Sequence, residues 1–360
     1  MKIGILGAGQ LGRMLALAGY RLDFDFVFLD PAAEACAAPL GEHIHAGYLD
    51  ETGLEDFCQR IDLATYEFEN VPAQTAAYVA SRRPLHPHPR ALETGQDRLS
   101  EKTLFEQLKI PVPRFATVDS RESLATAAQA IGFPCVLKTR RMGYDGKGQF
   151  VLRSAGQIDS AWARLGGHPL LLEAFVAFDR ELSCLGVRGR SGETAFYPVT
   201  ENVHHDGILR TSIPRARDAM QKLAEDYSGR VLQHLGYVGV LAFEFFVAGD
   251  RLLGNEIAPR VHNSGHWTID GAQCSQFENH LRAIAGLPLG STALRGPCAM
   301  VNFIGSHPDL GALAAIPELH LHLYGKAPKP SRKIGHANLT AGSDAALAAA
   351  LARLEGLLKG

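Results

Sequence analysis

The sequence predicts a mixed α/β and α+β chain made of consecutive domains, and two observations point to this fold class. Over residues 1–95, short apolar strands alternate with helical stretches, a pattern typical of a parallel sheet. Proline-rich segments at Arg83–Pro89 and Leu287–Pro297 interrupt the pattern and mark connectors. We therefore expect an N-terminal domain at 1–95, a larger domain at 96–287 and a small β-rich domain at 288–360.

Hydrophobic periodicity justifies the individual elements in turn. Apolar runs at Lys2–Leu6, Phe24–Asp30 and Leu63–Phe68 predict buried strands, and Leu11–Ala18 between the first two predicts a helix. Four leucines at helical spacing between residues 347 and 358 predict a last helix. The central region is expected to contain a helix at Gly95–Leu108, strands at Cys135–Lys138, Phe150–Leu152, Leu170–Val176 and Glu181–Val187, a helix at Gln221–Leu235 and then a hairpin.

Composition and charge restrict the classes of function. The 36 basic and 38 acidic residues give a net charge of −2, so no basic field attracts nucleic acid. The longest apolar stretch, near Val240–Val247, is broken by Glu244 and is too short to span a bilayer. Six cysteines without a C-x-x-C pair, together with the absence of a signal peptide, suit reduced thiols in a cytosol. We expect a cytoplasmic enzyme without membrane or nucleic-acid partners.

The glycine-rich turn GAGQLG at residues 7–12 admits two interpretations. It follows a predicted strand and opens a predicted helix, as the G-x-G-x-x-G fingerprint of dinucleotide-binding proteins does. Asp30 closes the next strand, where an acid that binds the ribose of NAD would be expected. Three fixed glycines are a weak signal, because turns of this kind also bind other phosphate esters. An NAD-dependent dehydrogenase and a phosphate-ester site both remain open on this motif.

A second glycine-rich loop joins the strand that ends at Lys138 to one that begins at Gln149. It carries three glycines and three cations, and backbone N–H groups with nearby cations can enclose a polyphosphate. It is not a Walker A loop, since no Gly-Lys-Ser/Thr sequence opens a helix. The alternative is a flexible hairpin with solvated cations.

The predicted hairpin at residues 240–260 carries a pair of carboxylates. Counting outward from the turn at Gly249–Asp250 pairs Glu244 with Glu256 and places Gly254 on the face of Glu256. Facing carboxylates on apolar strands repel one another and resist burial, and a divalent cation with oxygen ligands would compensate both effects. The neighbouring Asn255 could add an amide oxygen. The alternative is that one glutamate turns outward to an arginine.

The segment after the hairpin is rich in groups that bind anions and handle protons. Arg260 offers a bidentate fork for a small oxyanion, and His262 and Asn263 follow on a loop at the end of a strand. His262 and His266 have a spacing that could bind zinc on a helix, but Gly265 between them argues against a helix.

Six motifs, taken in order, resemble the ATP-grasp superfamily and, within it, the 5-(carboxyamino)imidazole ribonucleotide synthases of purine biosynthesis. They are GQLGRML, YEFENV, GYDGKGQ, VHHDGILRTS, NEIAPRVHNSGHWT and SRKIGHANLT, and they cover essentially the full length. The resemblance implies an ATP-grasp fold with an N-terminal Rossmann-like (pre-ATP-grasp) domain, a mobile subdomain at about 115–178 and a small C-terminal β-rich domain. It also implies that the N-terminal glycine turn receives a ribose phosphate and not NAD.

The same resemblance implies the activity. The expected reaction is the ATP- and bicarbonate-dependent carboxylation of 5-aminoimidazole ribonucleotide through carboxyphosphate, with ATP and magnesium as cofactors and a homodimer as the assembly. The alternatives are a formate-dependent glycinamide ribonucleotide transformylase and, from a different class, an NAD-dependent dehydrogenase.

The resemblance finally assigns roles to residues. Magnesium is expected at Glu244 and Glu256, and the catalytic residues are expected to be Arg260, His262, Asn263, Asp145 and Glu67. The nucleotide is expected to bind Arg98, Lys138, Gly143, Tyr144, Asp145, Gly146, Lys147, Gly148, Gln149, Glu173, Ala174, Phe175, Val176, Glu181, His204, Asn255 and Glu256. The ribonucleotide is expected to bind Gln10, Leu11, Glu67, Tyr144, Asp145, Lys147, Asn263, Lys326, Arg332 and Lys333.

Overall fold

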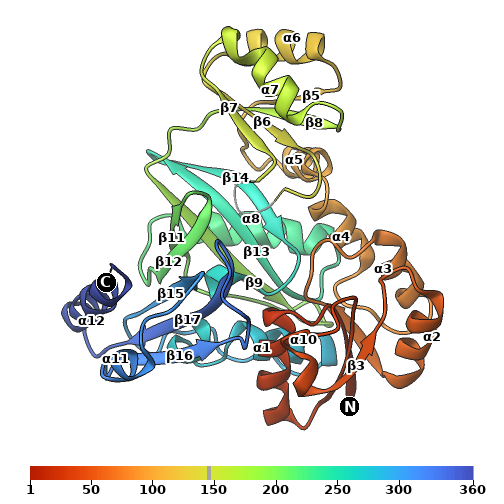
Figure 1. Cartoon of the computed structure of the whole chain (residues 1–360), viewed down its shortest axis with the longest axis vertical. Coiled ribbons are helices and arrows are strands. Elements are labelled where there is room, and N and C mark those ends of the chain that lie inside the picture. Colours follow the sequence, from red (N-terminus) through yellow and green to blue (C-terminus); the bar gives the residue numbers. More distant parts are fainter. Residues whose placement is uncertain (144–146, 360) are drawn as a thin grey trace.

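Three sheets organise the molecule, and the computed structural model describes residues 1–143 and 147–359. Figure 1 shows a large sheet in the middle, a small body above it and the N-terminal body beside its lower end. In the part of the chain that the structure describes, we find no helix long and apolar enough to cross a membrane.

The N-terminal body is a parallel four-stranded sheet in the order β3-β2-β1-β4. This confirms the strand–helix alternation that the sequence predicts, although the third predicted strand ends at Tyr66 instead of Phe68. Helix α1 packs on one face and shares a core with α10, whereas α2 and α3 cover the other face. The elements are β1 Lys2–Leu6, α1 Gln10–Gly19, β2 Asp25–Asp30, β3 Glu42–His45, α2 Glu51–Arg60, β4 Leu63–Tyr66 and α3 Ala73–Ala80.

Two short helices connect this body to the next one. The proline-rich connector runs directly into α4 (Pro89–Gly95), and α5 (Arg98–Gln107) follows with Asp97 as its N-cap. The Asp97 carboxylate accepts a hydrogen bond from Leu99 N at 3.0 Å, which satisfies one of the free N–H groups of the first turn. The predicted single helix over Gly95–Leu108 is therefore the end of α4 plus the whole of α5.

The small upper body is an antiparallel four-stranded sheet in the order β5-β8-β6-β7, with α6 and α7 sharing its core. It spans most of the segment expected to be a mobile subdomain, and that mobility stays a prediction. The predicted strand over Leu170–Val176 ends at Ala174. The elements are β5 Phe115–Val118, α6 Arg121–Ile131, β6 Cys135–Thr139, β7 Gln149–Leu152, α7 Ile158–Leu165 and β8 Leu170–Ala174.

The central sheet has nine strands, ordered β14-β13-β9-β11-β12-β15-β17-β16, with β10 paired to β9. Strands β12 and β15 pair through Thr211–Ser212 and Met300–Val301, so this sheet continues across the boundary expected at residue 288. The small C-terminal domain is therefore an extension of the central sheet. The elements are β9 Arg180–Arg188, β10 Thr194–Phe196, β11 Thr200–His205, β12 Ile208–Pro214, α8 Gln221–His234, β13 Gly239–Ala248, β14 Arg251–Ala258, α9 Thr268–Gly271, α10 Gln276–Ala285, β15 Cys298–Ile304, α11 Leu310–Ala314, β16 Leu319–Leu323, β17 Lys333–Thr340 and α12 Asp344–Lys359.

A β-bulge sets the register of the β13–β14 hairpin. Near the turn the strands pair as a two-residue loop requires, with Ala248 opposite Arg251. That register alone would place Glu244 opposite Asn255, but a register shift next to Glu244 brings Glu256 opposite Glu244. The predicted pairing of the two glutamates is confirmed. The prediction that Gly254 shares their face is wrong, because Gly254 pairs with Phe245 on the other side of the bulge.

Candidate active site

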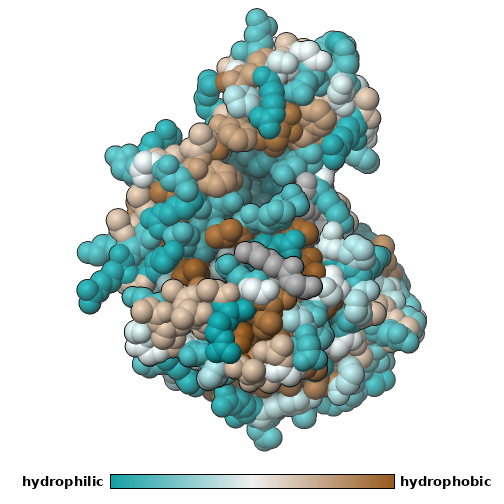
Figure 2. All heavy atoms as spheres, turned by 60° about the vertical axis from the view of Figure 1, so that its left-hand side comes forward, coloured by the Kyte–Doolittle hydropathy of each residue, from teal (hydrophilic) through white to brown (hydrophobic). Residues whose placement is uncertain are grey.

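One large cavity, of about 480 Å³, lies where the three bodies meet. Figure 2 shows hydrophilic surface in the hollow below the upper body. Residues from all three parts of the chain line the cavity, including Gln10 from α1, Lys138 from β6, Glu244 from β13 and Lys333 from β17. A ligand here would touch the N-terminal, central and C-terminal parts together.

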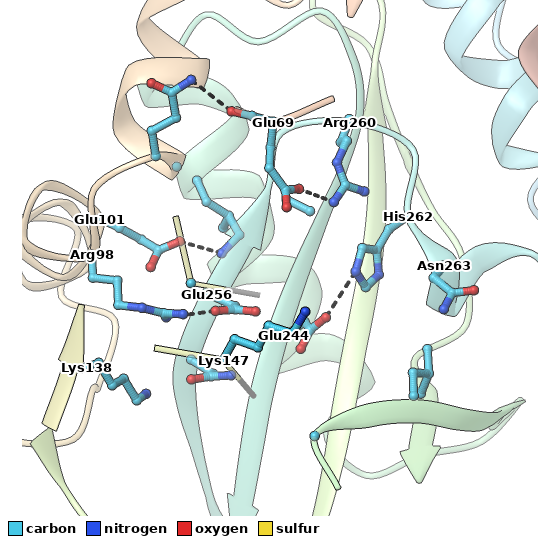
Figure 3. Close-up of a pocket in the computed structure, with 18 of the residues that line it drawn as sticks. Glu69, Arg98, Glu101, Lys138, Lys147, Glu244, Glu256, Arg260, His262 and Asn263 are labelled. Atoms are coloured by element: carbon cyan, nitrogen blue, oxygen red, sulfur yellow. Dashed lines mark hydrogen bonds and ion pairs between the residues drawn. The ribbon is translucent and has the colours of Figure 1, made fainter. Parts of the chain in front are cut away.

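The carboxylate pair lies inside this cavity, with each member held by a different partner (Figure 3). Glu256 Oε2 lies 2.8 Å from Arg98 Nη1, and Glu244 Oε1 lies 3.2 Å from His262 Nε2. Burial, and next the charge of Glu256, raise the pKa of Glu244 to about 8. Burial opposes ionisation of Glu256 as well, but the Arg98 guanidinium outweighs it and lowers the pKa of Glu256. The sequence also left open that one glutamate turns outward to an arginine. Glu256 does pair with an arginine, Arg98, but the pair lies inside the cavity.

The chemistry of the donor set fits a hard cation. Two facing carboxylates supply anionic oxygens, and the buried Oδ1 of Asn255 has no hydrogen-bond partner within the described residues. Across those same residues we find no group of three or more His, Cys, Asp and Glu side chains arranged to hold a metal. The zinc interpretation of His262 and His266 therefore gains no support: His262 faces Glu244, and Asn263–Gly265 between them form a 3₁₀ turn.

A buried ion cluster lies under the upper wall of the cavity. Glu173 Oε2 lies 2.9 Å from Lys138 Nζ and 3.6 Å from Lys102 Nζ, and Lys102 is fully buried. Burial would raise the pKa of Glu173, but the two lysines hold it at about 2. Lys138 lines the cavity, whereas Lys102 and Glu173 stand behind it. Sequence reasoning missed Lys102, whose lone position on α5 gives no signal.

The expected nucleotide segment Glu173–Val176 is therefore placed differently from the other expected residues. Glu173 points into the ion cluster, and none of these four residues is among the described ones that line the cavity. Phe175 is exposed at 44%, just beyond the end of β8.

The glycine loop of the upper body borders the cavity. Gly143, Lys147 and Gln149 line it, and Gly148 adopts a left-handed φ of 71° against Thr139. At the base of the loop, Arg140 forms hydrogen bonds of 2.7 and 3.0 Å with the Asp97 carboxylate. The expected residues Tyr144, Asp145 and Gly146 lie outside the described residues.

A histidine–carboxylate pair and an aromatic pair form another wall of the cavity. His204 Nδ1 lies 3.2 Å from Glu181 Oε2, as their assignment to one site requires. Burial would lower the pKa of His204, but the Glu181 carboxylate raises it above its usual value. Phe178 and Phe246 stack with their ring centroids 4.8 Å apart and also line the cavity. Sequence reasoning missed both phenylalanines.

Arg260 and Asn263 present buried polar atoms to the cavity. Arg260 donates a hydrogen bond to the carboxylate of Glu69, a residue of the YEFENV motif that sequence reasoning also missed. Gln96 holds the backbone of Glu69 by donating to its carbonyl oxygen at 2.8 Å. Arg260 Nε and both polar atoms of the Asn263 amide are buried without partners in the described chain. Buried polar groups of this kind normally have partners, so they indicate a polar ligand.

Glu67 occupies a place that differs from its expected one. Its carboxylate accepts hydrogen bonds from Gly9 N at 2.8 Å and Gly12 N at 3.3 Å, underneath the glycine turn. Burial raises the pKa of Glu67, and the described cavity lining does not include it. Gly7 has φ 103°, and a Cβ there would lie 2.7 Å from Glu67 Oε1, so the turn requires glycine.

The N-terminal glycine turn is also tied to Asp30. Ala8 N donates to Asp30 Oδ2 at 2.8 Å, and Ala32 N donates to Asp30 Oδ1 at 2.7 Å. The carboxylate expected on the ribose of NAD thus already binds the backbone. Gln10 and Leu11 follow the turn and line the cavity.

The three C-terminal cations differ in how they relate to the cavity. Lys326 donates a hydrogen bond to Gln10 Oε1, and Lys333 lines the cavity. Arg332 donates to the carbonyl oxygen of Ala327 at 3.2 Å within its own loop. Gln10 and Lys333 therefore line the cavity and Lys326 contacts Gln10, whereas Lys326 and Arg332 are not among the described residues that line it.

Three family models match successive parts of the chain. Residues 1–96 match the family described as "Ribonucleotide synthetase preATP-grasp domain", and residues 103–277 match "ATP-grasp domain". Residues 298–350 match "Phosphoribosylaminoimidazole carboxylase C-terminal domain".

Individual relatives are similar over their full length. The chain is 55% identical to the N5-carboxyaminoimidazole ribonucleotide synthase of Pseudomonas aeruginosa, over 100% of both chains. It is 54% identical to the crystal structure of the synthetase from Thermus thermophilus, with a TM-score of 0.95 over 99% and 98% of the two chains. The Aspergillus clavatus synthase, solved with ADP and 5-aminoimidazole ribonucleotide, is 31% identical, with a TM-score of 0.92 over 99% and 98%.

Proposed function

The chain belongs to the N5-carboxyaminoimidazole ribonucleotide synthase family of ATP-grasp ligases, and we propose that it carboxylates 5-aminoimidazole ribonucleotide with ATP and bicarbonate. One observation carries the proposal: a single cavity, lined from all three parts of the chain, contains a carboxylate pair, several cations and buried polar atoms that have no partner among the described residues. The Aspergillus clavatus relative, whose structure contains ADP and the ribonucleotide, supports the same choice of ligands.

The nucleotide binds between the upper body and the central sheet. Lys138 and Arg98 neutralise its phosphates, and Gly143, Lys147 and Gln149 of the glycine loop lie beside them. The Glu181 carboxylate accepts hydrogen bonds from the ribose, and the stacked Phe178 and Phe246 offer an apolar face to the base.

Glu244, Glu256 and Asn255 would hold the magnesium ion. When bound, magnesium neutralises the phosphate oxygens and so stabilises charge on the transferring group. The residues of this chain do the positioning: Arg98 keeps Glu256 ionised and His262 orients Glu244.

Bicarbonate binds between Arg260 and Asn263, where the buried Arg260 Nε and Asn263 Nδ2 have no partner in the described chain. One of its oxygens attacks the γ-phosphorus of ATP, which breaks the bond to ADP and forms carboxyphosphate. The exocyclic amine of the ribonucleotide then forms the N–C bond, inorganic phosphate leaves, and the amine loses a proton. Glu67 is anchored under the glycine turn, so of the two expected acceptors only Asp145 remains a candidate for that proton.

The ribonucleotide binds at the other end of the cavity. Its ring and ribose lie against Gln10 and Leu11, and its phosphate binds Lys326, Arg332 and Lys333. A cytoplasmic homodimer completes the proposal, and sedimentation equilibrium would measure its mass.

The test is ADP release from ATP. We expect release to require bicarbonate and to rise on addition of the ribonucleotide, with one ADP per carboxylated product. A dehydrogenase would instead bind NADH, and the engagement of Asp30 by Ala8 N and Ala32 N argues against that alternative. NADH binding without ATP turnover would refute the proposal.

A further inference from the structure

The ring of His262 is held in one tautomer by a backbone N–H group. Ser264 N donates a hydrogen bond to His262 Nδ1 at 3.3 Å. A backbone N–H can only donate, so Nδ1 must be the unprotonated nitrogen of a neutral imidazole. The proton of the ring therefore sits on Nε2, which lies 3.2 Å from Glu244 Oε1 (Figure 3).

A chain of buried polar side chains reinforces this assignment. Ser264 Oγ lies 2.9 Å from His262 Nδ1 and accepts a hydrogen bond from Ser183 Oγ at 2.8 Å. Because Ser264 Oγ accepts from Ser183, its own proton is available to Nδ1 as a second donor. Asn202 Nδ2 donates to Ser183 Oγ at 3.0 Å, and Ser212 Oγ donates to Asn202 Oδ1 at 2.7 Å.

The sheet explains why this chain reaches the carboxylate pair. Ser183 on β9 is the ladder partner of Glu244 on β13, and Asn202 and Ser212 continue across β11 and β12. Ser183, Ser212 and Ser264 are fully buried, so water does not compete for their hydrogen bonds.

We propose that Ser264, supported by Ser183 and Asn202, is a positioning residue that fixes His262 as a neutral Nε2–H donor to Glu244. This inference rests on the proposed function only where it concerns the cation. With both ring nitrogens engaged, His262 does not accept a proton from bicarbonate or from the amine. It orients one oxygen of Glu244, so that the other oxygen faces the cation position, and partners of this kind typically affect metal affinity by 10- to 100-fold.

The first test reads the ring directly in the unliganded enzyme. ¹⁵N NMR of histidine-labelled protein, with His262→Gln to assign the signals, should show an unprotonated Nδ1 and a protonated Nε2. A protonated Nδ1 or an imidazolium ion would overturn the proposal. Ser264→Ala removes the second donor but keeps the backbone N–H, so the Nδ1 signal should stay in the unprotonated range and move further from the protonated position. Ser228→Ala, which removes an equally buried serine hydroxyl on α8, should leave the signal unchanged.

The second test measures metal binding without turnover. Manganese binding to the ADP-loaded enzyme, followed by EPR without bicarbonate or ribonucleotide, should weaken about tenfold in Ser264→Ala and remain at wild-type strength in Ser228→Ala. Equal affinity in the two variants would overturn the proposed positioning role. If the wild-type enzyme bound neither ADP nor manganese, the proposed function would fail, whereas the NMR spectrum would still decide the tautomer.

The third test distinguishes two roles of His262, as a hydrogen-bond donor to Glu244 or as a catalytic acid or base. The amide of His262→Gln can still donate a hydrogen bond to Glu244, whereas His262→Ala cannot. We expect His262→Gln to retain at least about tenfold more manganese affinity and ADP release than His262→Ala. Equal losses in the two variants would overturn the proposal.

Discussion

Lys102 offers the sharpest perturbation of the proposed nucleotide site, because it shares Glu173 with Lys138 but does not line the cavity itself. Lys102→Met removes the charge and keeps a side chain of similar length. In the wild type, Glu173 is shared between Lys102 at 3.6 Å and Lys138 at 2.9 Å. After the substitution Glu173 neutralises Lys138 alone, and the repulsion between the two lysines is gone.

The expected magnitude follows from these distances. With an effective dielectric constant of about 20, the two attractions to Glu173 are about 5 kcal/mol for Lys102 and about 6 kcal/mol for Lys138. The negative charge of Glu173 is therefore shared almost equally by the two lysines. Without Lys102, that charge neutralises Lys138 alone, and less of the positive charge of Lys138 is left to attract a phosphate. We expect a loss comparable to one hydrogen bond to a charged group, about 1.5–3 kcal/mol, or roughly 10- to 100-fold in the KM for ATP.

Steady-state ADP release with varied ATP and varied ribonucleotide measures this effect. The KM for ATP should rise, and the KM for the ribonucleotide should stay within about twofold of wild type, because we propose that its phosphate binds the C-terminal cations. Lys222→Met, at an exposed lysine on α8, is the matched control. Equal KM values for ATP in Lys102→Met and Lys222→Met, both folded by circular dichroism, would refute the reasoning.

Three further perturbations test other parts of the site. Glu256→Gln should lower ADP release by at least about 100-fold while the fold survives, and a near wild-type rate at limiting magnesium would contradict the carboxylate assignment. Arg332→Ala and Lys333→Ala should raise the KM for the ribonucleotide far more than that for ATP, so equal effects on both would exclude a phosphate role. The pKa of Glu173 is lowered to about 2, so the stability that it contributes is present above its unfolded pKa and is lost as the pH falls below about 5. In urea unfolding, the advantage of the wild type over Glu173→Gln should shrink toward pH 2 by up to ~3 kcal/mol, and an advantage that grew on acidification would contradict the ion cluster.

Local patterns were sufficient to predict the hairpin but not its geometry. Alternation and the turn residues predict two strands, and counting pairs Glu244 with Glu256. The pairing of these two glutamates depends on a bulge that no local sequence pattern predicts, because the two-residue turn alone would place Asn255 opposite Glu244. The predicted pair of Glu244 and Glu256 is nevertheless correct, because the bulge adds Asn255 between the residues that pair with Phe245 and Glu244.

Local sequence patterns could not place the two glutamates of the YEFENV motif, Glu67 and Glu69. Strand β4 ends at Tyr66, so alternation no longer indicates which of Glu67 and Glu69 faces the cavity. Glu67 turns under the glycine turn, where Gly9 and Gly12 donate to it, and Glu69 binds Arg260. Both choices depend on partners far away in the sequence.

The supporting polar groups could not be predicted for the same reason. Lys102 acquires its role only when β8 brings Glu173 beside it, and Ser264 only when β9 brings Ser183 beneath it. Lone serines and lysines occur throughout the chain, and their contacts are set by how the bodies pack.

The fate of the bicarbonate oxygen tests the central claim most directly. If bicarbonate attacks the γ-phosphorus of ATP, ¹⁸O from labelled bicarbonate must appear in the inorganic phosphate released during carboxylation. We expect one labelled oxygen per phosphate in short incubations with ATP and the ribonucleotide. Phosphate whose new oxygen came from water, with the carboxylated product still formed, would contradict the account.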